Sequence, residues 1–307
     1  MLSVTFLGTS ASRPTVERGV SSIAVAREGE TLLFECGEGT QRQMMRYGVS
    51  FSLGEIFVTH YHADHFLGII GLVRTLGLQG REEPLHLYGP PGAEKNLGAA
   101  VALGVERAPF AIEIHQLKPG DVLKRDEYDL EVIDVEHGRN AVGFALREHQ
   151  RLGRFNPEKA REFGVPEGPL WGRLHRGEAV EIGGSADRRI VTPDEIVGPP
   201  RPGRLVVYSG DTRPCESVVA AAEGADLLVH EATFSQEEKD RAQETDHATA
   251  LEAAQVALAA RVKRLVLTHV SARFSAAPEV LADEAREVFA ETVVARDGMT
   301  IEVPLVE

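Results

Sequence analysis

The chain has 307 residues, of which 43% are hydrophobic and 26% charged, a balance typical of a globular protein with a sizeable buried core. Its apolar runs are too short for a membrane helix, and its N-terminus lacks the basic and apolar regions of a secretory signal, so we expect neither a membrane protein nor a secreted one. The net charge of −14 argues against a nucleic-acid partner unless positive charge is concentrated in one segment.

Short β-rich runs separated by glycines dominate the first half of the chain. Taken in order, strands are predicted at 2–7, 22–26, 31–35, 55–59, 84–88, 111–116, 129–135 and 142–147, with an alanine-rich helix at 92–104. Strand and helix then alternate, with strands at 205–208, 226–230, 265–268 and 292–295 and helices at about 214–223, 247–260 and 278–290. This alternation predicts an α/β sandwich rather than an all-β fold.

The segment from about 148 to 200 interrupts this pattern with six prolines, followed by Pro202, and many glycines. We interpret about 148–195 as an inserted arm with its return connection, within a single domain that spans 1–307. From Arg147 to Arg176 there are seven basic and four acidic residues, so this stretch has a net charge of +3. It is either a contact for a polyanion or a solvated loop of an arginine-rich chain.

The most informative stretch, Thr-His-Tyr-His-Ala-Asp-His at 59–65, follows the predicted strand 55–59. Residues two apart in an extended loop project to the same side, so His60 and His62 can hold one metal ion. Asp64 and His65 lie where the chain turns into a helix and can reach a second ion. Imidazole and carboxylate are ligands that zinc prefers, so the stretch predicts a metal site rather than isolated histidines.

Two metal ions need more than four ligands, and further donors follow other predicted strands. His137 follows 129–135, Asp211 follows 205–208 and His269 follows 265–268. Ligands of α/β sheets collect at the carboxyl ends of strands, so these side chains are expected to meet.

This set of separated motifs resembles the metallo-β-lactamase superfamily over nearly the whole chain. The resemblance implies an αββα sandwich with two Zn²⁺ ions per subunit. His60, His62 and His137 would hold the first ion, Asp64, His65 and His269 the second, and Asp211 would bridge both. Mn²⁺ is an alternative occupant, because these donors accept both metals.

Three further segments resemble the ribonuclease Z family of tRNA 3′-processing endonucleases. They are Phe-Glu-Cys-Gly-Glu-Gly-Thr-Gln at 34–41, His-Glu-Ala-Thr-Phe at 230–234 and Asp-His-Ala-Thr-Ala at 246–250. The chain departs from that family at Glu35, where the family usually has Asp. The residue is not expected to be a ligand, and Glu35 can still orient a histidine.

The resemblance implies that the chain hydrolyses precursor tRNA after the discriminator nucleotide, removing the 3′ trailer and leaving a 3′-OH. Asp64 would serve as ligand and proton acceptor, His247 would protonate the leaving 3′ oxygen, and Glu231 would hold His247. In the structural alternative, Asp246 caps the helix that begins at 247 and His247 faces solvent.

Gly-Pro-Leu-Trp-Gly-Arg-Leu at 168–174 resembles part of the long tRNA-binding exosite of the bacterial enzymes. The candidate substrate-binding residues are Arg154, Gly168, Pro169, Arg173 and, beyond His269, Arg273. Trp171 either stacks on the substrate or anchors the arm. Similarity also implies a homodimer in which the protruding arm of one subunit holds the tRNA that the other cuts.

Two other functions are compatible with parts of the sequence. The ligand set is shared by hydrolases of small phosphodiesters, thioesters, sulfate esters and β-lactams, so the histidine cluster does not exclude them. A nucleic-acid-binding protein with a structural zinc is disfavoured, because such sites are closed and often built from cysteines. Cys36 and Cys215 are the only cysteines, which fits a cytoplasmic protein with two small buried thiols.

Overall fold

The computed structural model describes residues 1–103, 107–184 and 187–305. It contains two compact units, one formed by Met1–Arg147 with Leu205–Pro304 and the other built on Glu148–Arg204. None of the helices in the described ranges is long and apolar enough to cross a membrane. Both cysteines are buried and free, as predicted.

The first sheet of the larger unit has seven strands, and its last four in spatial order are parallel. The order across the sheet is β16 (Thr300–Glu302), β1 (Leu2–Gly8), β2 (Ser22–Arg27), β3 (Glu30–Phe34), β4 (Glu55–Phe57), β5 (Leu85–Gly89) and β6 (Ile112–Gln116). The carboxyl ends of β3 to β6 therefore lie at one edge of the sheet.

The second sheet also has seven strands, four of them parallel. Its order is β15 (Thr292–Val294), β14 (Leu265–Thr268), β13 (Leu227–Glu231), β12 (Leu205–Tyr208), β9 (Val142–Glu148), β8 (Tyr128–Asp134) and β7 (Val122–Lys124). Strands β12 to β15 are parallel, whereas β9 pairs antiparallel with β12.

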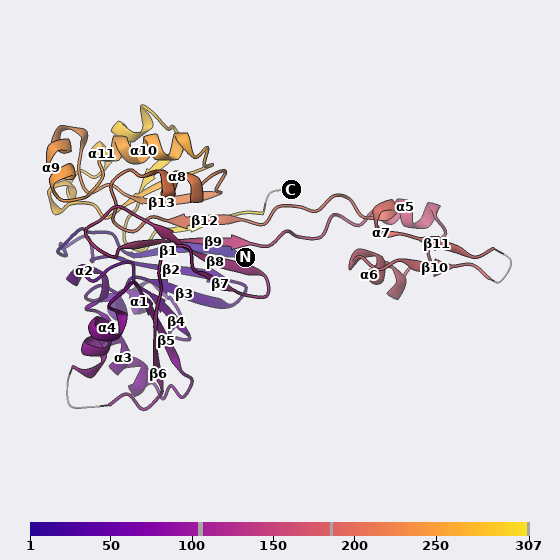
Figure 1. Cartoon of the computed structure of the whole chain (residues 1–307), viewed down its shortest axis with the longest axis horizontal. Helices are drawn as coiled ribbons and strands as arrows, with labels where there is room; N and C mark the ends of the chain where they lie inside the picture. Colours follow the sequence, from indigo (N-terminus) through magenta and orange to yellow (C-terminus); the bar gives the residue numbers. More distant parts are fainter. Residues whose placement is uncertain (104–106, 185–186, 306–307) are drawn as a thin grey trace. The chain divides into compact units, whose positions relative to one another are not determined.

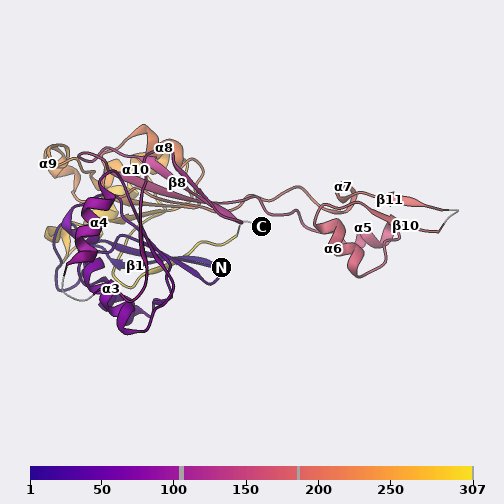
Figure 2. The same ribbon diagram turned by 60° about the horizontal axis from the view of Figure 1, so that its bottom comes forward.

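The two sheets pack face to face between two layers of helices (Figures 1 and 2). One apolar core fills the space between the sheets, with Phe34, Phe57 and Phe144 among its largest members. A second core lies under α1 (Thr40–Tyr47), α3 (Ile69–Leu78) and α4 (Ala93–Ala102). A third lies under α8 (Glu216–Ala221), α10 (Ala250–Ala259) and α11 (Glu279–Arg286). The predicted αββα sandwich is confirmed.

Helix boundaries differ from the predictions where capping decides them. Helix α10 begins at Ala250 rather than 247, because Thr249 and Glu252 form a reciprocal capping box. Helix α4 ends at Ala102, and the predicted end at Gly104 lies outside the described residues. Helices α1 and α3 are not among the predicted elements; glycines at 71 and 77 interrupt the apolar pattern of α3.

Shorter helices lie in the connecting loops of the larger unit. They are α2 (Ala63–Phe66), η1 (Gln236–Glu238), α9 (Lys239–Glu244) and η2 (Ala272–Phe274). Helix α2 contains Asp64 and His65, so the predicted turn into a helix at this point is confirmed.

The smaller unit is more regular than its proline content suggested. It contains α5 (Pro157–Glu162), α6 (Pro169–His175), β10 (Val180–Ile182), β11 (Arg189–Val191) and α7 (Pro193–Ile196), while residues 185–186 of the predicted return connection lie outside the described residues. Trp171 packs against this unit's small apolar core, and its Nε1 donates to the Val165 carbonyl at 3.1 Å. Trp171 therefore anchors the unit.

Candidate metal centre

The seven predicted ligands come together at the carboxyl ends of four strands. His60 follows β4 in the first sheet, while His137, Asp211 and His269 follow β8, β12 and β14 in the second. The ligands thus come from both halves of the sandwich. They form one group of His60, His62, His137 and Asp211 and another of Asp64, His65 and His269.

In the first group, three histidine nitrogens converge on one point. His62 Nδ1 lies 2.9 Å from His60 Nε2 and 3.2 Å from His137 Nε2. Nitrogens bound to one tetrahedral zinc at roughly 2.0–2.1 Å are about 3.3–3.4 Å apart, so a slight rotation of the rings lets the three share an ion.

The second group is linked to the first by Asp211. Oδ2 of Asp64 lies 3.4 Å from His65 Nε2 and 3.3 Å from His269 Nε2. Asp211 Oδ2 lies 3.2 Å from His65 Nε2, 3.3 Å from His269 Nε2 and 3.6 Å from His60 Nε2. One carboxylate oxygen therefore faces both groups, as a bridging ligand must.

Buried polar atoms in this cluster lack the partners that burial normally demands. Among the described residues, His65 Nε2 and Asp211 Oδ1 are buried without a hydrogen bond of normal geometry. Such groups are costly unless an ion or water satisfies them. His62 is the one ligand that is exposed. The donor set therefore fits two transition-metal ions with access from one side.

The second ring nitrogen of His60, His137 and His269 lies within hydrogen-bond distance of an outer partner. His60 Nδ1 lies 3.0 Å from Thr59 Oγ1, and His269 Nδ1 lies 2.8 Å from Thr233 Oγ1. His137 Nδ1 lies 2.8 Å from the Asp246 carbonyl. Such contacts hold the tautomer and the orientation of metal-binding imidazoles.

Glu35 plays the same part for His65. Its Oε1 lies 3.3 Å from His65 Nδ1, and both side chains are fully buried. Thr59 donates its backbone N–H and its hydroxyl to the same carboxylate. The predicted role of Glu35 in orienting a histidine thus has a defined partner.

Two glycines bring the 34–41 motif against α2. Cys36 N donates to the His65 carbonyl at 2.7 Å, and Gly68 N donates to the Cys36 carbonyl at 2.8 Å. A Cβ on Gly68 would lie 1.9 Å from the Gly37 carbonyl oxygen, and one on Gly37 would lie 2.4 Å from that of Asp64. Only glycine permits this approach at either position.

Several non-glycine residues around the centre have a left-handed backbone. Glu35, Asp246 and His269 have φ values of 62°, 58° and 55°. Ser12, with φ of 60°, donates its N–H to Asp64 Oδ2 at 2.7 Å. Such conformations are unfavourable and persist where surrounding contacts enforce them, as they do in functional sites.

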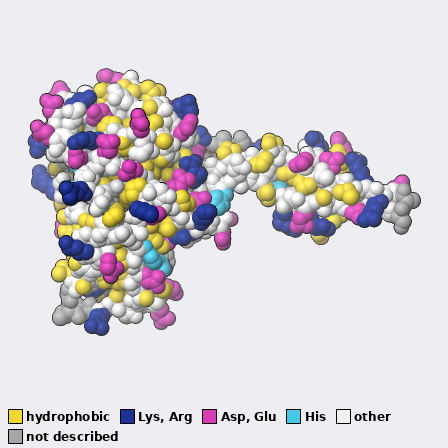
Figure 3. Space-filling view, in the orientation of Figure 1, with side chains coloured by type: hydrophobic (Ala, Val, Ile, Leu, Met, Phe, Trp, Pro, Cys, Tyr) yellow, Lys and Arg dark blue, Asp and Glu magenta, His cyan; other side chains and the backbone are white. Residues whose placement is uncertain are grey.

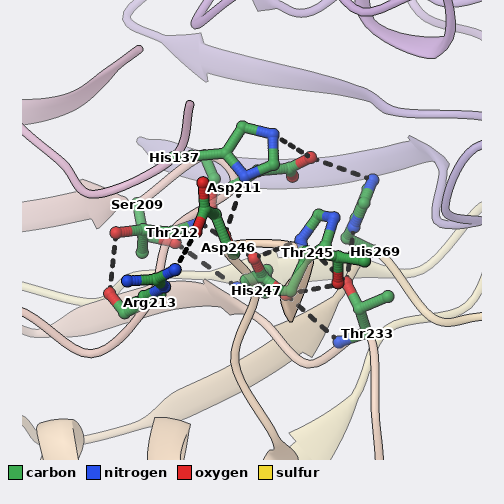
Figure 4. Close-up of polar contacts among 12 residues, drawn as sticks. His137, Ser209, Asp211, Thr212, Arg213, Thr233, Thr245, Asp246, His247 and His269 are labelled. Carbon is green, nitrogen blue, oxygen red and sulfur yellow. Dashed lines mark hydrogen bonds and ion pairs between the residues drawn. The ribbon is translucent and has the colours of Figure 1, made fainter. Parts of the chain in front are cut away.

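His247 lies beside the metal ligands His137 and His269 (Figure 4). Glu231 holds its ring. Its Nδ1 is 2.7 Å from Glu231 Oε1, and its ring centroid is 4.7 Å from that of His137. Glu231 also accepts hydrogen bonds from Thr212 N at 2.8 Å and Thr233 Oγ1 at 2.7 Å. The carboxylate is therefore fixed while it holds the imidazole.

The structural alternative for the 246–247 pair is wrong. Thr249, not Asp246, caps α10. Asp246 instead accepts from Gly138 N at 3.3 Å and pairs with Arg213. Only 11% of the His247 side chain is exposed, so it faces the centre rather than bulk solvent.

Burial and neighbouring charges shift the ionisation of these groups. Burial, with the charge of His65, lowers the pKa of His60, which favours the neutral ring that offers a lone pair. Burial alone would lower the pKa of His247, but the charge and hydrogen bond of Glu231 outweigh it and raise that pKa to about 9. His247 is thus protonated at neutral pH.

A cavity of about 300 Å³ adjoins His247. Its lining includes Arg13, Arg241, Arg273 and Phe234. The Arg273 guanidinium lies 5.6 Å from the centre of the Phe234 ring and pairs with Glu238 at 2.7 Å. The cavity therefore combines positive charge with an aromatic face.

The other predicted substrate-binding residues belong to the smaller unit. Gly168 and Pro169 begin α6, and Gly168 has φ of 125°, so this Gly-Pro pair has a structural role. Arg173 pairs with Glu178 at 2.9 Å. The backbone carbonyl of Arg154 accepts a hydrogen bond from Gly198 N at 2.9 Å within the same unit.

Sequence reasoning did not assign roles to Ser12, Thr59, Thr233 and the Asp246 carbonyl. Thr59, Thr233 and Asp246 lie within the motifs 59–65, 230–234 and 246–250. Their position next to the predicted site residues was the only sequence signal for their roles. Ser12 lies in the N-terminal segment, far in sequence from Asp64, and only the fold brings the two together.

Comparisons with known proteins agree with this geometry. The model of the metallo-β-lactamase superfamily matches residues 15–269. The chain is 56% identical to a ribonuclease Z of Gemmatimonas aurantiaca, covering 100% of this chain and 97% of the relative. It is 55% identical to a ribonuclease Z of Myxococcus xanthus, covering 99% of each.

Among solved structures, the short form of human tRNase Z aligns with a TM-score of 0.70 and 28% identity, over 99% of this chain and 100% of that chain. The chain belongs to the ribonuclease Z family within the metallo-β-lactamase superfamily.

Proposed function

We propose that the chain is a zinc-dependent endoribonuclease that removes the 3′ trailer of precursor tRNA. It cuts after the discriminator nucleotide, leaving a 3′-OH on the tRNA and a 5′-phosphate on the trailer. The observation that carries the proposal is the pair of donor groups joined by Asp211, with His247 held beside them by Glu231. Membership of the ribonuclease Z family supports the same reaction.

Two Zn²⁺ ions would be held by the seven ligands, the first by His60, His62 and His137 and the second by Asp64, His65 and His269, with Asp211 shared. Bound there, they would lower the pKa of a water and offset charge on the phosphoryl oxygens. Mn²⁺ remains an alternative occupant, because imidazole and carboxylate ligands accept both ions.

Side chains of the protein transfer the protons of the reaction. Asp64 keeps its carboxylate near the reacting phosphate and accepts the proton of the attacking water, while the Ser12 N–H donates to its Oδ2. His247 donates a proton to the leaving 3′ oxygen. Glu231 keeps His247 protonated and turns its ring toward the centre.

The cavity next to His247 suits a nucleotide adjoining the scissile phosphate. Arg273 would contact a phosphate, and Phe234 presents a ring face on which a base can stack. The pairing of Arg273 with Glu238 keeps the guanidinium beside the Phe234 ring.

The 148–204 unit is proposed to be the tRNA-binding exosite of a single metallo-β-lactamase-like domain, with Arg154 and Arg173 contacting phosphate and Gly168 and Pro169 shaping the surface. Its charge is balanced, with ten basic and nine acidic residues, and Figure 3 shows the two signs interspersed. On binding tRNA, side chains such as Arg173 would therefore exchange a carboxylate partner for a phosphate group. A cytoplasmic homodimer, in which this unit of one subunit holds tRNA cut by the other, completes the proposal.

The test is cleavage of a transcribed precursor tRNA with a short 3′ trailer, before and after metal removal by a chelator. One chelator-sensitive cut after the discriminator nucleotide, restored by Zn²⁺, is the expected result. Absence of a cut by metal-loaded protein would overturn the tRNA assignment. Turnover of a small phosphodiester in that case would favour the second candidate, a hydrolase of small esters, which the shared ligand set supports.

A further inference from the structure

A second histidine cluster lies on the first sheet, on strands that carry none of the seven ligands. His86 is on β5, and Glu113 and His115 are on the adjacent parallel strand β6. His86 pairs directly with Glu113 in the strand register, and Tyr88 pairs with His115. Because side chains two apart share a face of a strand, all four project from the same face.

The three donor atoms are spaced like ligands of one ion. His86 Nδ1 lies 3.1 Å from His115 Nε2 and 3.4 Å from Glu113 Oε2, and His115 Nε2 lies 3.9 Å from Glu113 Oε2. Ligands at roughly 2.0–2.2 Å in a tetrahedral zinc site are separated by about 3.3–3.6 Å. Small rotations of the Glu113 side chain are enough to complete this geometry.

Aromatic packing holds the two imidazoles in place. The His115 ring stacks on Tyr88 at 4.6 Å, and Tyr88 stacks on the buried Phe57 at 4.7 Å. The Tyr88 hydroxyl donates to Glu55, which also pairs with Arg125. The histidines therefore stand on a rigid support, which reduces the entropy lost when a ligand binds.

Within the described part of the chain, Glu113 has no lysine or arginine partner, and its ion-pair partners are His86 and His115 alone. The side chains of His86, His115 and Glu113 are 33%, 37% and 52% exposed, so an ion from solvent can reach all three. A carboxylate and two imidazoles, preorganised and accessible, form the donor set that zinc prefers.

We propose that His86, Glu113 and His115 bind a divalent transition-metal ion, Zn²⁺ being the occupant, at a surface site separate from the catalytic centre. Nδ1 of His86, Nε2 of His115 and one carboxylate oxygen of Glu113 are the protein ligands. Three protein ligands leave the fourth position to water or to a donor from another molecule.

The experiment counts Zn²⁺ bound to the full chain by equilibrium dialysis, with metal analysis over a range of free Zn²⁺. The wild type is compared with a His86→Ala/His115→Ala variant and with His149→Ala, a matched control that removes an exposed histidine of the other unit. We expect the double variant to bind one equivalent less than both others. Glu113→Gln should weaken this equivalent at least tenfold. Equal binding by the wild type and the double variant would overturn the proposal.

Failure of this site and failure of the catalytic centre are distinguishable. The difference between the wild type and the double variant does not depend on how many ions the catalytic ligands hold. His115→Ala alone, which removes one half-exposed ring, provides a second variant whose thermal unfolding without added Zn²⁺ should match the wild type. Added Zn²⁺ should raise the Tm of the wild type by more than it raises the Tm of His115→Ala, because an ion that binds only the folded state stabilises that state. An equal rise in both would also contradict the site.

Discussion

Glu35 Oε1 lies 3.3 Å from His65 Nδ1, and neither side chain is exposed to solvent. The side chain of Glu35, one methylene longer than that of aspartate, is accommodated within the buried motif. Thr59 binds the same carboxylate through its N–H and hydroxyl. The Glu35 carboxylate thus orients the predicted metal ligand His65 and also holds Thr59, the residue before His60.

Replacing Glu35 with Ala should weaken zinc binding about 10- to 100-fold, because the partner that orients His65 is lost. Competition with a chromogenic chelator measures the change. Glu35→Asp is the matched control and should retain most of the affinity, since it keeps the carboxylate. Equal losses in both variants would show that side-chain length, not charge, decides binding.

Asp211→Asn should lower the zinc content and reduce tRNA cleavage by at least about a thousandfold. The bridging carboxylate faces both donor groups, and metal ions contribute several kcal/mol to catalysis. Metal analysis and single-turnover cleavage measure the two effects. Full zinc content with normal cleavage would exclude a bridging role.

Cleavage should decline at alkaline pH as His247 loses its proton. Glu231 raises the pKa of His247 to about 9 against the opposing effect of burial, so the acid is present below that pH and lost above it. Glu231→Gln removes the negative charge and should move the alkaline decline to lower pH. The pH profile of kcat checks this, with metal content as the control. An unmoved decline in Glu231→Gln would assign it to another group.

Removing the smaller unit should separate tRNA cleavage from hydrolysis itself. Arg147 and Leu205 are neighbours on the paired strands β9 and β12, so residues 149–203 can be replaced by an Asn-Gly turn between Glu148 and Arg204. We expect tRNA cleavage to fall at least about 100-fold, as when several phosphate contacts are lost.

Hydrolysis of a small chromogenic phosphodiester should remain near the wild-type rate, because all seven ligands lie in the larger unit. Retained tRNA cleavage would contradict the exosite assignment. Loss of both activities, with zinc still bound, would contradict the independence of the centre from the smaller unit.

Gly68→Ala should lower the free energy of unfolding by about 1–3 kcal/mol, as overpacking in a dense interior does. The added Cβ would lie 1.9 Å from the Gly37 carbonyl oxygen, and the backbone on either side must shift. Denaturant unfolding measures the change. Gly54→Ala is the matched control, because a Cβ there meets nothing within 4 Å. Equal stability of the two variants would show that the contact relaxes without cost.

The sequence by itself determined the donors and the local geometry that presents them. Histidine and aspartate follow the strands β4, β8, β12 and β14 at the positions predicted from strand ends. The ligand positions could be predicted from the strand ends because hydrophobic runs and the turns that follow them are local properties of the chain. The αββα arrangement was inferred from family resemblance, and the order of the strands within each sheet was not predicted, since periodicity does not report which strands pair.

Only the tertiary structure decided which groups touch. The contact of Ser12 with Asp64 joins residues whose contact no local pattern encodes. The contact of Glu231 with His247 agrees with what the family resemblance implied. His86 and His115 are 29 residues apart in the sequence and belong to no recognisable metal-binding motif. Parallel pairing of β5 with β6 brings them within reach of one ion. Long-range strand pairing, not residue type, creates these relationships.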